Sequence, residues 1–129
     1  MTNYTNYVDE ARQVIGKIKN RCGNRIDITT SQIRKFLSQL NSVYNKYTAL
    51  EADGRYLPEQ LDKQIVEHMM AVKVSLIYQC ARSGQVKKFC KDDAQLLDKI
   101  ERIKTWKDFQ DFFKYVQALV AYHKYEGGN

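Results

Sequence analysis

The chain has 129 residues and a net charge of +6 at pH 7, and 43% of its residues are hydrophobic and 28% charged. These values suit one soluble globular domain over residues 1–129 and argue against a disordered chain. No apolar run approaches the ~20 residues of a membrane span. The first twenty residues, which include Asp9 and Glu10, show no apolar signal-peptide core, so we expect no membrane or secretory targeting.

Helices are the regular structure that the sequence predicts. One proline and six glycines leave few helix breakers, and apolar residues recur at helical spacing almost throughout. We therefore predict an all-α fold, a compact single-domain bundle of about five helices. The first covers about residues 3–20, with Ala11 and Ile15 on its apolar face, and Gly23 follows its end.

The second predicted helix opens at residues 29–31, whose three hydroxyls suit an N-cap. Its apolar stripe runs from Ile33 to Tyr47. The opposite face carries Arg34, Lys35 and small polar side chains without a carboxylate. Residues 51–57 are predicted to form a loop, and Pro58 suits the first turn of the next helix.

The third predicted helix, about residues 58–83, is apolar on two sides. Leu61 to Cys80 follow one side, and Val66 to Ala81 follow the other. A helix that is apolar all round is usually buried, so we expect it at the centre of the domain. The core is also expected to include three tyrosines, Tyr44, Tyr47 and Tyr78.

The fourth predicted helix spans about residues 86–103, with a possible break at Asp92 and Asp93. Its expected buried residues are Val86, Phe89, Leu97 and Ile100. The fifth begins at Thr105, three residues before Asp108, in an arrangement like a capping box. Its apolar stripe runs from Phe109 to His123.

Metal and cofactor sites receive little support from the sequence. The possible ligands, Cys22, Cys80, Cys90, His68 and His123, form no C-x-x-C or H-x-x-x-H pair, so we expect no metal and no cofactor. The odd, widely spaced cysteines favour a reducing cytoplasm. Cys80 and Cys90 are interpreted as small buried apolar residues.

His123 is the one residue that suggests catalysis. It stands beside Lys124, and a histidine near basic residues can serve as a general base in RNA cleavage. Its spacing places it on the apolar stripe with Phe113 and Val120, which favours a structural role. RNA contact is the remaining alternative. The interpretation that we adopt is a protein that is not an enzyme.

The charges are segregated along the chain. Residues 11–26, 28–50 and 68–91 contain basic residues and no acid, while carboxylates concentrate in 51–67 and 92–111. Selection for solubility alone tends to intersperse the two signs. The pattern therefore predicts a surface that meets phosphate, with plain solvated faces as the alternative. Base stacking by tyrosine is less favoured, because it usually occurs on sheets.

Three segments carry a resemblance to a known family. They are residues 28–37 (ITTSQIRKFL) with Asn41 and Tyr44-Asn45 behind them, residues 73–82 (KVSLIYQCAR) with Lys87-Lys88-Phe89, and residues 118–128 (ALVAYHKYEGG). Together they resemble the small subunit of the type III-A CRISPR effector, the Csm complex. The resemblance covers most of the chain from residue 26 onward. Residues 1–25 and 49–60 match no pattern of that family.

The resemblance implies a helical protein stacked in several copies along the guide RNA and its target RNA in antiviral defence. Its partners would be the large subunit, the backbone subunit and further copies of itself, in the cytoplasm. In that family an aspartate of the backbone subunit cuts the RNA, and the large subunit makes the cyclic-nucleotide messenger and cleaves DNA. The acids Asp92, Asp93, Asp108 and Asp111 would then be surface or capping groups.

Seven basic residues are the RNA contacts that the resemblance implies for this sequence. Arg34, Lys35, Lys73 and Arg82 come first, followed by Lys87, Lys88 and Lys124. Lys73 lies between the two apolar sides of its helix, where a lysine can extend its ammonium group to the surface. Two other functions stay open: a helix-turn-helix DNA-binding protein that reads with the second or third helix, and a purely structural adaptor.

Overall fold

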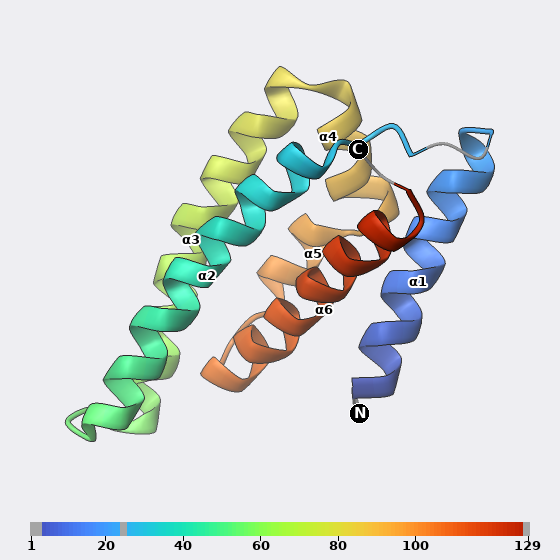
Figure 1. Cartoon of the computed structure of the whole chain (residues 1–129). Helices are drawn as coiled ribbons and strands as arrows, with labels where there is room; N and C mark the ends of the chain where they lie inside the picture. Colours follow the sequence, from blue (N-terminus) through green and yellow to red (C-terminus); the bar gives the residue numbers. More distant parts are fainter. Residues whose placement is uncertain (1–3, 24–25, 128–129) are drawn as a thin grey trace.

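The computed structural model describes residues 4–23 and 26–127 (Figure 1). Its elements are α1 (Tyr4–Arg21), α2 (Thr30–Asp53), α3 (Pro58–Arg82), α4 (Gly84–Lys88), the π-helix η1 (Phe89–Asp93), α5 (Leu96–Glu101) and α6 (Trp106–Tyr125). No strand occurs among these residues, and the prediction of an all-α bundle is confirmed.

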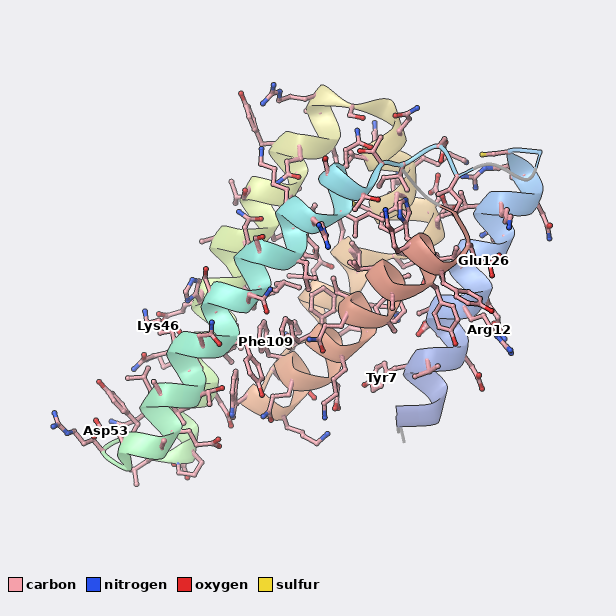
Figure 2. All side chains as sticks on the ribbon, in the orientation of Figure 1. Tyr7, Arg12, Lys46, Asp53, Phe109 and Glu126 are labelled. Carbon is pink, nitrogen blue, oxygen red and sulfur yellow. The ribbon has the colours of Figure 1, made fainter. Side chains whose placement is uncertain are left out.

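Helix α6 forms the centre of the bundle. It packs against α1 on one side and against α2 and α3 on the other. Phe109 and Leu119 are fully buried, and Figure 2 shows Phe109 pointing into the bundle from α6. Its apolar stripe was predicted from helical spacing and is confirmed down to His123.

Helix α3 is not the buried centre that its sequence predicts. Leu61 and Leu76 lie in the core, but Met70 is 42% exposed, Val74 67% and Ile77 47%. The helix lies at the margin of the bundle, with α2, α4, α5 and α6 as its neighbours. Hydrophobic periodicity shows which sides of a helix are apolar, but it does not show whether the same chain covers them.

The α2–α3 pair extends beyond the other helices as an antiparallel arm (Figure 1). Helix α2 continues through Asp53, so the predicted loop at 51–57 shortens to residues 54–57. Gly54 ends α2 with φ of 73°, a left-handed conformation that glycine adopts without strain. Pro58 occupies the first turn of α3, as predicted.

The caps fix where three helices begin. The Thr29 side chain accepts a hydrogen bond from the backbone N–H of Gln32 at 3.2 Å, and the Gln32 side chain accepts one from Thr29. The Thr105 hydroxyl accepts from the N–H of Asp108 at 3.0 Å. Both predicted N-termini are therefore confirmed. Ser83 separates α3 from α4 and caps the latter.

The segment after α3 is more broken than the predicted helix 86–103. It divides into α4, η1 and α5, and Gln95 between the last two has a positive φ of 55°. Asp93 is not a surface group as expected, because it is only 7% exposed and accepts two hydrogen bonds from the Arg21 guanidinium at 2.7 and 2.9 Å. Leu96 is buried in the core, and Leu97, which was predicted to be buried, is partly buried against it.

Some of the residues that were expected in the core are buried, and one is exposed. Tyr47 is buried, and the Tyr44 ring stacks on Phe113 with centroids 4.7 Å apart. Tyr78 is 64% exposed, so its assignment to the core is wrong. Cys80 and Cys90 are buried as predicted, and burial raises the pKa of both thiols, which keeps them protonated.

Candidate nucleic-acid interface

His123 fastens the end of α6 to the start of α2. Its side chain is 1% exposed, and Nε2 donates a hydrogen bond to the Ile28 carbonyl at 2.6 Å. Nδ1 lies 3.5 Å from the Thr30 hydroxyl. This burial supports the structural role favoured by the sequence and leaves the ring no access to RNA.

A second link brings the end of α3 to the same place. The Gln32 side-chain amide in the first turn of α2 donates to the Ser83 hydroxyl at 3.5 Å. Ser83 directly follows α3 and caps α4. The start of α2, the end of α3, α4 and the end of α6 therefore meet at one end of the molecule, which Figure 1 shows beside the label of α4.

Six of the seven predicted contact residues belong to these four segments. We call this set the basic end, and it comprises Arg34, Lys35, Arg82, Lys87, Lys88 and Lys124. All six side chains are exposed. Four separate stretches of the sequence contribute to it, and the links through Ser83 and His123 bring those stretches together.

The cations of the basic end are almost free of ion partners. Of the six, only Lys88 forms an ion pair within the described residues, with Asp92 one turn away at 3.9 Å. The Arg82 guanidinium lies over the Tyr78 ring, 5.7 Å from its centroid. Exposed cations without neighbouring carboxylates are available to phosphate oxygens without first breaking an internal ion pair.

Lys73 is the predicted contact that the structure sets apart. It lies in the middle of α3, with only 20% of its side chain exposed, and forms an ion pair with Glu101 of α5. Lys73 lowers the pKa of the Glu101 carboxyl through this pair. The ammonium group does extend from between the apolar sides of α3, but toward a carboxylate.

A polar seam between α2 and α3 was missed as a candidate. The Gln39 side-chain amide donates to the Ser75 hydroxyl at 2.9 Å, while Gln39 Oε1 is buried without a hydrogen-bond partner among the described residues. Beside it lies an open hollow of about 310 Å³, lined partly by Gln39, Ser42 and His68. The seam offers hydrogen-bonding groups along the outer side of the arm.

Lys46 adds a positive charge near His68, beside this seam. Figure 2 shows it on the outer side of α2, away from the core. Burial and the charge of Lys46 lower the pKa of His68. The sequence signal was the recurrence of Lys35, Gln39 and Lys46 at intervals of four and seven residues, which puts all three on one side of a helix.

The cations on the α1 side behave differently, because they hold the fold together. Arg21 binds Asp93 of η1, and Lys99 of α5 binds Glu10 of α1 at 2.9 Å. Lys19 of α1 binds Glu126 just after α6 at 3.1 Å. Two of these pairs neutralise Lys19 and Arg21, which belong to the acid-free window 11–26 that the sequence had counted toward a phosphate-binding surface.

Within residues 4–23 and 26–127, no three His, Cys, Asp or Glu side chains gather as a metal site would require. In the same ranges, no helix combines the length and the apolar character needed to cross a bilayer. The chemistry that the arrangement does offer is electrostatic: exposed guanidinium and ammonium groups beside amide and hydroxyl donors suit a polyanionic backbone.

Comparisons with known proteins identify the family of the chain. The family model described as "Csm2 Type III-A" matches residues 2–129. A Streptococcus thermophilus protein named CRISPR system Cms protein Csm2 is 35% identical over 124 residues, which cover 95% of this chain and 93% of that protein. A Mycobacterium tuberculosis protein of the same name is 33% identical over 120 residues, covering 92% and 90%. The chain therefore belongs to the Csm2 family of type III-A CRISPR systems.

Proposed function

We propose that this protein is a non-catalytic small subunit of a type III-A CRISPR ribonucleoprotein, and that its basic end binds the backbone of the guide RNA–target RNA duplex. The observation that carries the proposal is the group of exposed cations at the basic end, five of which have no ion partner among the described residues. Family membership supplies the ribonucleoprotein context.

The mechanism is electrostatic and geometric. Arginine and lysine side chains on phosphates neutralise charge and fix the position of the duplex without reading its bases. Base pairing between guide and target then supplies the sequence specificity. The protein holds the duplex in shape while a neighbouring backbone subunit cuts the target, and the large subunit and further copies of this chain complete the assembly in the cytoplasm.

A helix-turn-helix function finds less support in the fold. Such a motif joins two helices at about 90–120° through a short turn and presents the second helix to the major groove. Here α2 and α3 form a long antiparallel arm, and α4, which follows α3 directly, has only five residues. Neither pair presents a reading helix of the required kind.

The decisive experiment reverses two charges at the basic end. In a reconstituted complex, Arg34→Glu with Arg82→Glu should weaken RNA retention and slow target cleavage at least 100-fold, because two contacts of about 1–2 kcal/mol each become repulsive. Both side chains are exposed, and neither forms a hydrogen bond or an ion pair within the described residues, so the melting temperature should stay close to that of the wild type.

The matched control is Arg12→Glu with Arg102→Glu, which changes the net charge equally. Both arginines are exposed, and their only ion pairs within the described part of the chain are local and 3.8 Å long. This control is better than one at Lys99, whose bond to Glu10 links α5 to α1. Equal losses from both pairs would mean that only net charge matters. Undamaged RNA retention in Arg34→Glu/Arg82→Glu would leave a structural adaptor as the function.

The non-catalytic part of the proposal has its own test. The isolated protein should degrade neither RNA nor DNA, with or without a divalent metal. Nuclease activity that copurifies with the chain and disappears in His123→Ala would contradict it. Circular dichroism must show that this variant is still folded, because the buried ring donates a hydrogen bond to the Ile28 carbonyl.

A further inference from the structure

The open hollow of about 310 Å³ beside the α2–α3 seam combines polar groups from two helices. We call it the seam hollow. Gln39 and Ser42 of α2 and His68 of α3 supply its polar atoms, and the rest of its lining is apolar. A cavity with an apolar wall and a few convergent polar groups is the usual form of a site for a small chemical group. The polar atoms decide which group fits.

Two of these polar groups need a donor from a ligand. The Ser42 hydroxyl donates its proton to the Ser38 carbonyl at 3.3 Å, so its oxygen is left to accept. Gln39 Oε1 is buried without a hydrogen-bond partner among the described residues, while the amide nitrogen donates to Ser75. A small turn about the terminal torsion of the amide, which is soft, can bring Oε1 to the hollow. A donor supplied there removes the cost of an unsatisfied acceptor.

A ribose 2′-hydroxyl has the hydrogen-bonding groups that this arrangement needs. Phosphate oxygens only accept hydrogen bonds, so they do not suit acceptors such as Ser42 Oγ and Gln39 Oε1. The 2′-hydroxyl both donates and accepts. It can donate to one of these oxygens and accept from a ring N–H of His68, which the imidazole carries in either protonation state. The donors on the base edges of a duplex are already engaged in base pairing.

Lysines before and after the seam hollow place it along a sugar–phosphate backbone. Lys35, Gln39, Ser42 and Lys46 recur at intervals of three or four residues, on one side of α2. Both lysines are exposed, and they lie about 16 Å apart along the helix axis. That length spans several phosphates of one strand. A strand that binds both lysines therefore passes its sugars over the hollow.

We propose that the seam hollow binds the 2′-hydroxyl of one ribose in the bound RNA and thereby distinguishes RNA from DNA. The inference rests on the proposed function, because phosphate contacts must first hold the strand along α2. It adds what those contacts do not supply: RNA and DNA carry the same phosphates, and the 2′-hydroxyl is the group by which they differ at a given nucleotide.

Fluorescence anisotropy of the full chain with two duplexes of the same sequence tests the inference. One duplex is RNA, and the other carries fluorine in place of every 2′-hydroxyl. Fluorine keeps the phosphate charge and the A-form geometry of the duplex, but it cannot donate a hydrogen bond. The wild type should bind the RNA duplex about three- to tenfold more tightly, since the fluorinated duplex lacks one net hydrogen bond.

Variants of the hollow should remove this preference. Ser42→Ala/His68→Phe should bind both duplexes as the wild type binds the fluorinated one, and phenylalanine keeps a ring beside Tyr47, 5.7 Å from its centroid in the wild type. Ser42→Ala alone changes an exposed residue and should lose part of the preference. Thr48→Ala is the matched control, because it removes an exposed hydroxyl from another side of α2. It should keep the full preference.

Equal binding of the two duplexes by the wild type would overturn the inference, and so would an undiminished preference in Ser42→Ala. The same assay separates this failure from that of the proposed function. Lys35→Ala should weaken both duplexes equally and leave their ratio unchanged, because it removes a phosphate contact. If the wild type binds neither duplex, the proposed function fails as well. If it binds both tightly and equally, the phosphate contacts stand and the seam hollow has no role in recognising RNA.

Discussion

The cations of the α1 side meet carboxylates from distant parts of the chain, whereas those of the basic end do not. Arg21 binds Asp93 across 72 residues of sequence, and Lys99 binds Glu10 across 89. Arg34 and Arg82 have no such partner among the described residues. Both regions are rich in basic residues, so charge composition alone does not distinguish them. The position of the carboxylates decides which region stabilises the fold and which is available to a polyanion.

The largest effect should come from breaking the strongest pair of the α1 side. Asp93→Asn removes one charge from a side chain that is 2% exposed and leaves the Arg21 guanidinium without its counterion. We expect the free energy of unfolding to fall by about 2–3 kcal/mol, less than for a fully buried pair because Arg21 is partly solvated. Urea denaturation measures this loss.

The neighbouring residue supplies the control for that experiment. Asp92→Asn changes the same charge at an exposed position and should cost less than about 0.5 kcal/mol. RNA affinity, measured where both variants are folded, should stay unchanged. An equal loss of stability in the two variants would show that the Arg21–Asp93 pair does not hold η1 to α1.

The second prediction concerns a single contact at the basic end. Lys35→Ala should weaken RNA binding by the free subunit about five- to tenfold, since one phosphate contact is lost. The slope of log affinity against log salt should become shallower by about 0.7–0.9, because one contact releases correspondingly fewer counterions. Fluorescence anisotropy at several salt concentrations gives both quantities.

The same affinity measurement should be made with two RNAs of unrelated sequence. A backbone contact carries no base information, so Lys35→Ala should weaken both to the same extent. A loss confined to one sequence, or an affinity that ignores salt, would contradict binding through phosphate alone.

Local features of the fold followed from the sequence. The N-caps at Thr29 and Thr105 and the stripe of α6 depend on residues within a few turns, where helical spacing and capping chemistry decide the result. Long-range pairing did not follow: nothing near Asp93 in the sequence indicates that Arg21 covers it. The exposed outer side of α3 was missed for a related reason, since its burial depends on what lies against it.

The candidate site was predictable to a similar degree. Arg34, Lys35 and Arg82 lie in acid-free windows and were chosen through the family resemblance, but their meeting at one end depends on the hydrogen bond from Gln32 to Ser83. Lys73 came from a window of the same kind and proved to be paired with Glu101. An acid-free window therefore predicts which cations are available to phosphate only when the positions of carboxylates from the rest of the chain are also known.

The third prediction tests whether the positive surface continues along the α2–α3 seam. Burial and Lys46 both lower the pKa of His68, so the neutral imidazole is favoured in the folded protein. Its contribution to stability is present above the unfolded pKa of about 6.5 and is lost as the pH falls through the lower folded pKa. Lys46→Ala should raise the His68 pKa, as followed by NMR titration of the ring protons.

The same titration reports on bound RNA. Phosphates near Lys46 would favour the charged imidazolium, so RNA should raise the His68 pKa in the wild type. Lys46→Ala should also weaken RNA binding, by less than Lys35→Ala, because Lys46 lies farther from the basic end along α2. A His68 pKa that RNA leaves unchanged would confine the interface to the basic end.

The smallest effect is expected at Lys73, and it tests the comparison most directly. Lys73 shares its helix with Arg82 and came from the same acid-free window, but Glu101 already neutralises it. Lys73→Ala should therefore leave RNA affinity within about twofold of the wild type, while Lys35→Ala does not. Glu101→Gln is the matched variant, because it releases the ammonium group and should increase affinity slightly and steepen the salt dependence. If Lys73→Ala instead weakens binding as much as Lys35→Ala, the ion pair opens when RNA binds, and an internal carboxylate does not exclude a cation from the interface.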